Sequence, residues 1–239
     1  MSTNFLKVGS ITVCICVCAV VLALTQVATA YPLAGTMSDP SGANVPPPDV
    51  TGDPVGTLVA KYPDEHWSFT TTGGRTTSGT MDTAVYLESN GTVDFYFQVT
   101  NDASSASSIA RVSMVSFSLF STSVGFRRDG ASLPGGVFEN GTCSPTAHCP
   151  NTADRDRSVV GFNFGPTAAG RIAPGQTSVV FVISTDAKHW THGNIELIDG
   201  GEVTLDGAFQ PTSGVPEPTT MALLGGGLLG LVGFRRYRR

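Results

Sequence analysis

Residues 92–100 read TVDFYFQVT, and this stretch decides the fold class. Its apolar and polar side chains alternate, which is the pattern of a β-strand with one face on a core. The two faces are Val93, Phe95, Phe97 and Val99 on one side and Asp94, Tyr96, Gln98 and Thr100 on the other. Asn90-Gly91, a strong hairpin signal, stands just before the strand, so we expect it to pair with residues 81–88.

Similar short alternating segments follow along the chain, with turn residues between them. No stretch of this region shows a 3.6-residue period with helix caps. The sequence therefore predicts an all-β domain over residues 57–210, an antiparallel β-sandwich of immunoglobulin-like or jelly-roll type. The further strand segments are 109–120, 158–165, 177–185, 194–198 and 202–205, with turns at 173–176 and 199–201.

The segment before this domain, residues 31–56, is rich in Pro, Gly and Asp and has almost no apolar periodicity. Pro46-Pro47-Pro48 favours an extended polyproline II conformation. We expect a flexible N-terminal arm outside the core.

The N-terminus has the layout of a secretory signal peptide over residues 1–30, in which a signal helix is expected. Lys7 precedes an apolar run at 11–24, and Ala28 and Ala30 supply the small residues before a cut at Tyr31. The expected partners are the Sec export machinery and signal peptidase; the alternative is a retained N-terminal helix.

Cys143 and Cys149 are the cysteines that remain in the mature chain, because Cys14, Cys16 and Cys18 leave with the signal peptide. In an oxidising compartment two such cysteines most simply form a disulfide. A metal site with His148 is the alternative, but a fourth ligand is missing nearby.

The C-terminal tail, residues 211–239, combines three features. Pro216 and Pro218 forbid helix around Glu217, and an apolar run follows at 221–234. As a helix this run would span about 21 Å against a hydrocarbon core of about 30 Å, so it is a marginal anchor. Residues 219–234 are the expected short transmembrane helix. The chain ends on a cluster that would stay cytoplasmic and orient the tail, formed by Arg235, Arg236, Arg238 and Arg239.

In order and spacing, Val215-Pro216-Glu217-Pro218, the short Gly/Leu-rich span and the terminal arginines resemble the PEP-CTERM sorting signal. The resemblance implies recognition by an exosortase, a membrane protease or transpeptidase that cuts near the Pro-Glu-Pro motif. It also implies transient residence in the inner membrane, and then a place at the surface or in the exopolysaccharide or biofilm matrix. From the physics of the tail alone, an ordinary single-span anchor is the alternative.

Between Tyr31 and Val215 there are nine basic and eighteen acidic residues, a net charge of −9. The whole chain is at −5, because the terminal arginines offset part of this charge. An acidic domain argues against nucleic acid or anionic lipid as a partner.

Two segments invite a search for metal chemistry. His189 and His192 stand three apart, but they fall between a strand and a turn and lack the Glu of a zinc-protease motif, so a solvated loop is expected. Residues 154–157 alternate Asp and Arg and lack the Gly of a calcium loop, which predicts a self-neutralising surface loop.

The sequence has no G-x-S-x-G elbow, P-loop or G-x-G-x-x-G, so we expect no enzyme, no cofactor and no metal. Trp67 and Trp190, with Tyr62 and Tyr86 behind them, could contact a glycan, although a core position is the default for a Trp in a small sandwich. The expected function is therefore a structural or adhesive role, with a secreted carbohydrate-binding module as the alternative and a secreted hydrolase third.

Overall fold

The computed structural model describes residues 31–33, 44–70, 73–141, 143, 149–167, 170–198 and 202–214. Several expected features lie outside these residues: the signal peptide with Ala28 and Ala30, the Val215–Pro218 motif, the 219–234 span and the terminal arginines. Among the described residues, no helix combines the length and the apolar character needed to cross a membrane.

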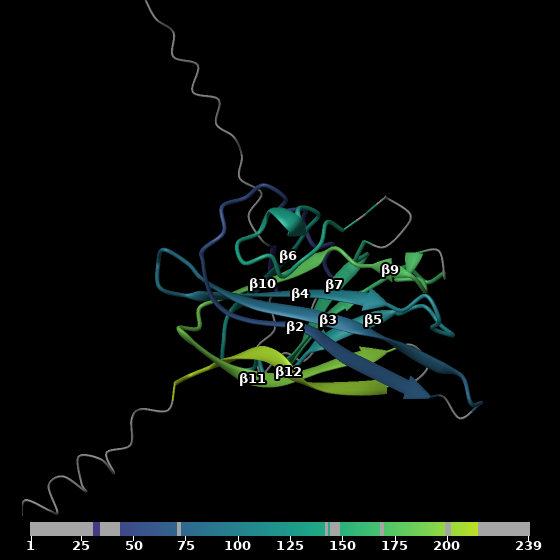
Figure 1. The fold of residues 1–239 in the computed structure, drawn as a ribbon. Helices are drawn as coiled ribbons and strands as arrows, with labels where there is room; N and C mark the ends of the chain where they lie inside the picture. The colour runs from purple at the N-terminus through teal and green to yellow at the C-terminus, as the bar shows by residue number, and fades with distance from the viewer. Residues whose placement is uncertain are drawn as a thin grey trace, which may run out of the picture.

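Two antiparallel sheets form the domain (Figure 1). The seven-stranded sheet runs β1 (Tyr31–Leu33), β6 (Thr122–Arg127), β10 (Val180–Thr185), β4 (Val93–Asn101), β3 (Thr76–Leu87) and β2 (Thr57–Thr70), with β9 (Gln176–Thr177) beside β4. The five-stranded sheet runs β12 (Glu202–Thr212), β11 (His189–Ile198), β5 (Arg111–Met114), β8 (Val159–Asn163) and β7 (Thr152–Asp156). A 3-10 turn, η1, covers Gly130–Ser132. The antiparallel sandwich expected from the sequence is confirmed.

The β3–β4 hairpin forms where the alternating stretch and its turn predict it. Gly91 takes the left-handed conformation, with φ at 83°, that the turn requires and that glycine adopts without strain. The Asn90 carboxamide oxygen accepts hydrogen bonds from the backbone N–H and the hydroxyl of Thr92, at 2.9 and 2.7 Å. The turn thus fixes the register that pairs Leu87 with Val93.

The main core lies between the two sheets and is rich in aromatic side chains. Phe162 of β8 stacks on Phe181 of β10 with their centroids 4.9 Å apart, and Phe95 meets the edge of Phe117 at 5.6 Å. Fully burying one such side chain stabilises the fold by about 1.5–3 kcal/mol. The face of β4 that holds Phe95 is therefore directed at the opposite sheet.

A second apolar cluster covers the other face of the seven-stranded sheet. Tyr86 and Tyr96 lie there with Val50, and residues 133–138 pack over them. Because this face is covered as well, β4 is buried on both sides, including Asp94 and Gln98.

Residues 44–50, which we call the strap, connect the two sheets along one side of the sandwich. Val45 exchanges hydrogen bonds of 2.9 and 2.7 Å with Ala153 of β7. Val50 donates to the Phe126 carbonyl of β6 at 2.9 Å, and Phe126 donates to the Pro48 carbonyl at 3.0 Å. The expectation of a flexible arm is therefore wrong for residues 44–56, which belong to the folded domain.

Three other segments differ from the sequence prediction. The strand expected over 109–120 ends at Met114, because Ser116 adopts a φ of 74° that breaks the extended chain. Residues 189–192 belong to the ten-residue strand β11 and not to a loop. The fourteen-residue β2 is not among the strand segments that the sequence predicts, and its pairing with β3 has an irregularity between Tyr62 and Glu65.

Candidate functional site

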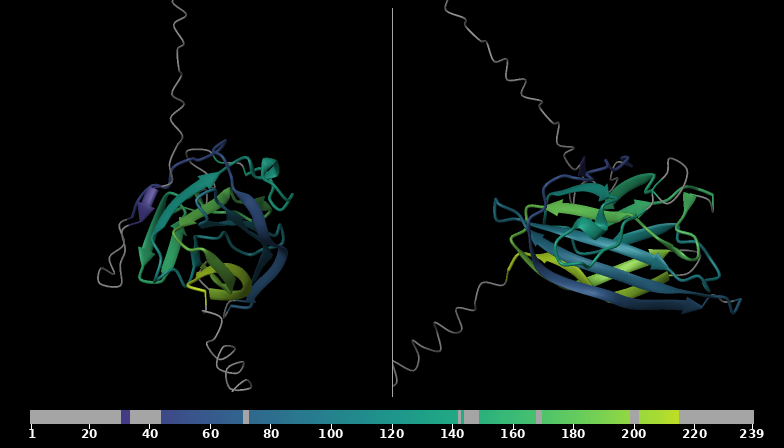
Figure 2. Two further views of the ribbon diagram at one scale, coloured as in Figure 1. Left: turned by 90° about the vertical axis from the view of Figure 1, so that its left-hand side faces the viewer. Right: turned by 45° about the horizontal axis from the view of Figure 1, so that its top comes forward.

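The two sheets meet along the side opposite the strap, where β2 approaches β12 (Figure 2, left). Glu65 of β2 accepts a hydrogen bond of 2.7 Å from the backbone N–H of Gly207 in β12. The Tyr62 ring lies against Gly207 so closely that a Cβ there would be 2.6 Å from the ring edge. We call this contact of Tyr62, Glu65 and Gly207 the seam, and a side chain at position 207 would displace Tyr62 and Glu65.

A row of four rings crosses the seam from β2 to β12 and β11. Tyr62 meets His192 edge-on at 6.1 Å, His192 lies 5.0 Å from Phe209, and Trp190 meets Phe209 edge-on at 5.1 Å. Within the row Phe209 is buried, while Tyr62 is 42% exposed, His192 is exposed and Trp190 is half-buried. This ring row presents aromatic side chains to solvent on a rigid base.

The other two rings considered for a glycan contact lie inside the protein. Trp67 is 3% exposed, stacks on Phe69 at 6.3 Å and packs over Gly79. Tyr86 is fully buried and its hydroxyl donates to the Pro134 carbonyl at 2.9 Å. Of the rings that the sequence nominates, Trp190 and Tyr62 are the accessible ones.

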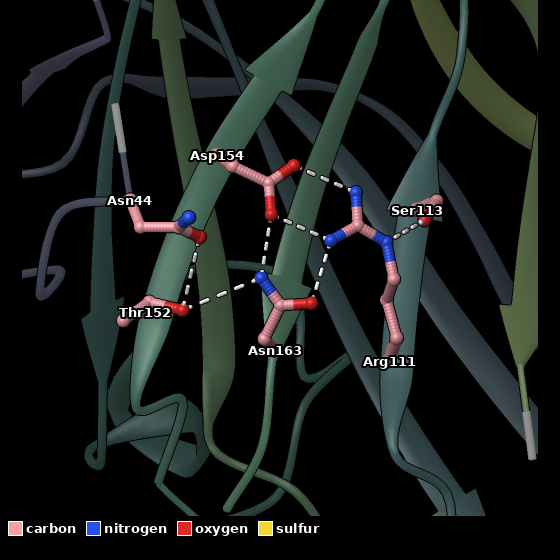
Figure 3. A network of polar contacts seen from close by, with 6 residues as sticks. All are labelled: Asn44, Arg111, Ser113, Thr152, Asp154 and Asn163. Atoms are coloured by element: carbon pink, nitrogen blue, oxygen red, sulfur yellow. Dashed lines mark hydrogen bonds and ion pairs between the residues drawn. The ribbon is translucent and has the colours of Figure 1, made fainter. Parts of the chain in front are cut away.

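A polar network lies across β5, β8 and β7 (Figure 3). The Arg111 guanidinium donates two hydrogen bonds to Asp154, at 2.6 and 2.7 Å, and a third to the Asn163 carboxamide oxygen at 2.6 Å. It passes over Gly161, where any side chain would collide with it. Burial would raise the pKa of Asp154, but hydrogen bonds from Arg111 and Asn163 hold the pKa below its ordinary value.

Residues 154–157 are therefore not the self-neutralising surface loop that the sequence predicts. They belong mostly to β7, and Asp154 pairs with Arg111, which is 43 positions earlier in the chain. Arg155 points the opposite way and is 3% exposed.

Arg155 organises the irregular segment that follows β5. Its guanidinium donates to the carbonyl oxygens of Phe117, Phe120 and Arg157 and to the Thr122 hydroxyl. Burial lowers the pKa of Arg155, although nearby Asp186 offsets part of that effect. No local pattern in the sequence predicts that Arg155 binds this segment, because the acceptors are mainly backbone carbonyls.

The Cys143–Cys149 disulfide forms as predicted, with the two Cα atoms 5.1 Å apart. In the part of the chain that the structure describes, no group of three or more His, Cys, Asp or Glu side chains could hold a metal ion. His148, the possible metal ligand beside the cysteines, lies outside that part.

The polypeptide leaves the sandwich directly after β12. Thr212 ends this strand opposite His189, and Gly214 turns with a φ of 63° against the His189 ring. After Gly214 the sequence continues with the Pro-Glu-Pro tail, the short apolar run and the terminal arginines.

Residues 214–239 match the family model of the PEP-CTERM protein-sorting motif, so the chain carries this sorting motif. It marks a protein that is exported toward the cell surface and sorted by an exosortase. Among curated proteins and among solved structures, none matches the chain.

Proposed function

We propose that the sandwich is a structural or adhesive domain that acts at the cell surface or in the exopolysaccharide matrix after its tail has been processed. One observation carries this proposal. β12, the last strand that the structure describes, ends at Thr212, two residues before the sorting motif begins at Gly214. A cut within Val215–Pro218 therefore leaves every strand of the sandwich intact.

The N-terminal end of the domain supports the same proposal, in which export and signal-peptide removal precede processing of the tail. β1, Tyr31–Leu33, lies on the mature side of the proposed signal-peptidase cut after Ala30. Export through the Sec machinery and removal of residues 1–30 would thus leave a chain whose first three residues pair with β6. The tail then holds the protein in the inner membrane until the exosortase acts.

The strap and the seam suit a domain that persists outside the cell. Exposed strand edges are templates for pairing with other chains. Val45 and Ala153 bridge the strap to β7, and Glu65 bonds Gly207 across the seam. Because these contacts occupy edges of β7, β2 and β12, we expect other molecules to contact surface side chains and not these strand edges.

Fractionation of the native cells tests the proposal. Wild-type protein is expected in the matrix and medium in a shortened form, while Glu217→Ala is expected to accumulate in the membrane at full length. Glu139→Ala removes an exposed carboxylate from the domain and serves as the control, with wild-type distribution expected. Equal distribution of Glu217→Ala and wild type would contradict the proposal.

The ring row favours carbohydrate binding as a second candidate function. Ring faces of Trp and Tyr pack against the C–H groups of sugar rings, and large aromatic side chains bury much area in such contacts. Trp190 and Tyr62 would supply these faces; Trp190 is half-buried, packs against the main core and meets Phe209 edge-on.

Depletion of the protein from solution by exopolysaccharide purified from the native cells measures this activity. Trp190→Ala and Tyr62→Ala are expected to weaken binding at least several-fold. Leu119→Ala is the control, because Leu119 is 71% exposed and does not belong to the row. Binding that all three variants retain, or no binding by wild type, would remove the second candidate and leave the structural role.

A further inference from the structure

One end of the main core contains buried polar atoms that have no hydrogen-bond partner among the described residues. They are Trp67 Nε1, Thr77 Oγ1, Asn101 Oδ1 and Gln176 Oε1. Leaving a buried donor or acceptor without a partner costs about 1–3 kcal/mol. The combined cost of four such atoms would be a large fraction of the free energy of unfolding of a domain, so their arrangement calls for a physical explanation.

The strand registers place these residues together. Trp67 of β2 pairs with Gly79 of β3, Gly79 pairs with Asn101 of β4, and Asn101 pairs with Gln176 of β9. Directly paired residues share one face of a sheet, and adjacent strands lie about 4.8 Å apart. Thr77, two residues from Gly79, lies on the same face. The face is the inner one, because Val99 of the core is two residues from Asn101.

Gly79 allows the indole of Trp67 to extend toward Asn101. A Cβ at position 79 would lie 2.6 Å from Cζ2 and 2.9 Å from Cε2 of Trp67, so the ring covers the glycine. Cε2 is the atom bonded to Nε1. The indole N–H is therefore held above Gly79, between its own strand and that of Asn101.

Hydrogen bonds from its nitrogen fix the orientation of the Asn101 carboxamide. Its Nδ2 donates to the carbonyl oxygens of Ser107 and Ile172, both at 2.9 Å. These two bonds determine which end of the amide is the nitrogen, and they leave Oδ1 as an acceptor within a fully buried side chain.

We propose that Trp67, Thr77, Asn101 and Gln176 form an internal site for ordered water. A water can accept from the Trp67 N–H and donate to Asn101 Oδ1, and further waters can bind Thr77 and Gln176 separately. Buried waters make about three hydrogen bonds each to groups of this kind. The site links β2, β3, β4 and β9 to the loops that contain Ser107 and Ile172.

The chemistry of the four atoms selects water over a cation. The two carboxamide oxygens and the Thr77 hydroxyl could contact a cation, but the Trp67 N–H carries a partial positive charge and would repel it. A water satisfies a donor and acceptors at once. None of the four groups is a carboxylate, which hard cations prefer.

NMR of the full chain in detergent tests the site, because the protein has two tryptophans and therefore two indole N–H signals. The Trp67 signal is expected to show a cross-peak to long-lived water and slow exchange with solvent. Trp190, half-buried on the surface, is the internal control and is expected to exchange faster. A Trp67 signal without a water cross-peak would overturn the proposal.

Thr77→Val provides an independent measurement, since Val has nearly the same shape but no hydroxyl. If the hydroxyl binds internal water, the variant is expected to raise the unfolding equilibrium constant by roughly 5- to 30-fold and to weaken the Trp67 water cross-peak. If the hydroxyl has no partner, Thr77→Val will be neutral or stabilising and the spectrum will not change. That outcome would contradict the water site. So would a cation effect, in which calcium or potassium salts raise the free energy of unfolding above its value in a sodium salt at equal ionic strength.

Discussion

The Arg155 guanidinium donates a 2.6 Å hydrogen bond to the carbonyl oxygen of Phe117, 38 positions earlier in the chain. Phe117 lies beyond Met114, where β5 ends; its N–H donates to the Ser158 carbonyl, and its carbonyl accepts from Arg155. Phe117 itself contributes its ring to the core against Phe95. A buried cation thus holds the backbone whose side chain completes the core.

Replacing Arg155 is therefore expected to be costly. Arg155→Met keeps the apolar length but leaves buried carbonyl oxygens without donors, so we expect a loss of about 3–5 kcal/mol in the free energy of unfolding. Urea unfolding followed by circular dichroism measures it. Arg157→Met is the control, because its side chain is exposed, and a change within about 0.5 kcal/mol is expected there. Equal effects of the two variants would contradict the role assigned to Arg155.

Asp94 predicts a pH dependence of stability. Burial raises its pKa from 3.8 to about 6, although the Ser184 hydroxyl bonds the carboxylate at 2.8 Å. Because the folded-state pKa is above the unfolded value, the contribution of Asp94 to stability is complete below about pH 4 and is lost as the pH rises through 6. The free energy of unfolding should fall by on the order of 2–3 kcal/mol between pH 4 and pH 7. Asp82, whose pKa burial also raises, acts in the same direction.

Asp94→Asn should remove most of this dependence and stabilise the protein at pH 7, because the amide keeps an acceptor oxygen for Ser184. Thermal unfolding of both proteins at pH 5 and pH 7 measures the difference. Asp156→Asn, at an exposed position, is the control and should keep the wild-type slope. An unchanged slope in Asp94→Asn would show that other groups cause the dependence.

The seam predicts that Gly207 does not tolerate a side chain. A Cβ would approach Tyr62 and Glu65 within contact distance, so Gly207→Ala is expected to destabilise the protein by about 1–3 kcal/mol. Adding Tyr62→Ala in the same chain should recover part of this loss, which a double-mutant cycle measures. Additive effects of the two changes would mean that the strands do not meet as described.

The packing of the strap predicts that the buried side chain of Val50 stabilises the folded domain. Val50 is 5% exposed and lies in the second apolar cluster, so Val50→Ala is expected to cost about 1–2 kcal/mol. Val59→Ala is the matched control, because Val59 is 41% exposed. If chemical unfolding gives the same free energy for both variants, residues 44–50 would be the loose arm that composition alone suggests.

Local signals in the sequence predicted the parts of the fold that depend on neighbours in the chain. Alternation in 93–99 and the Asn90-Gly91 turn were enough for the β3–β4 hairpin. The strap could not be found in this way, because the burial of Val50 depends on a sheet face that other strands build. Arg155 was missed because its acceptors are distant backbone carbonyls, so the charged tetrapeptide around it resembles an exposed loop.

At the candidate site, the ring row likewise could not be predicted from local sequence signals. Trp190 was a candidate from its residue type alone, but its neighbours are set by the approach of β2 to β12. Glu65 and Gly207, which make that approach, are 142 positions apart. The sorting motif, in contrast, was readable in full because its features follow one another along the chain.

Intact-mass analysis of the mature protein from the membrane and the medium of its native cells tests the central claim most directly. Export and exosortase sorting predict a chain that starts at Tyr31 and ends within or near Val215–Pro218, recovered outside the membrane. A chain that still ends at Arg239 and occurs only in the membrane would show that the tail is an ordinary anchor, and the account of a released domain would be contradicted.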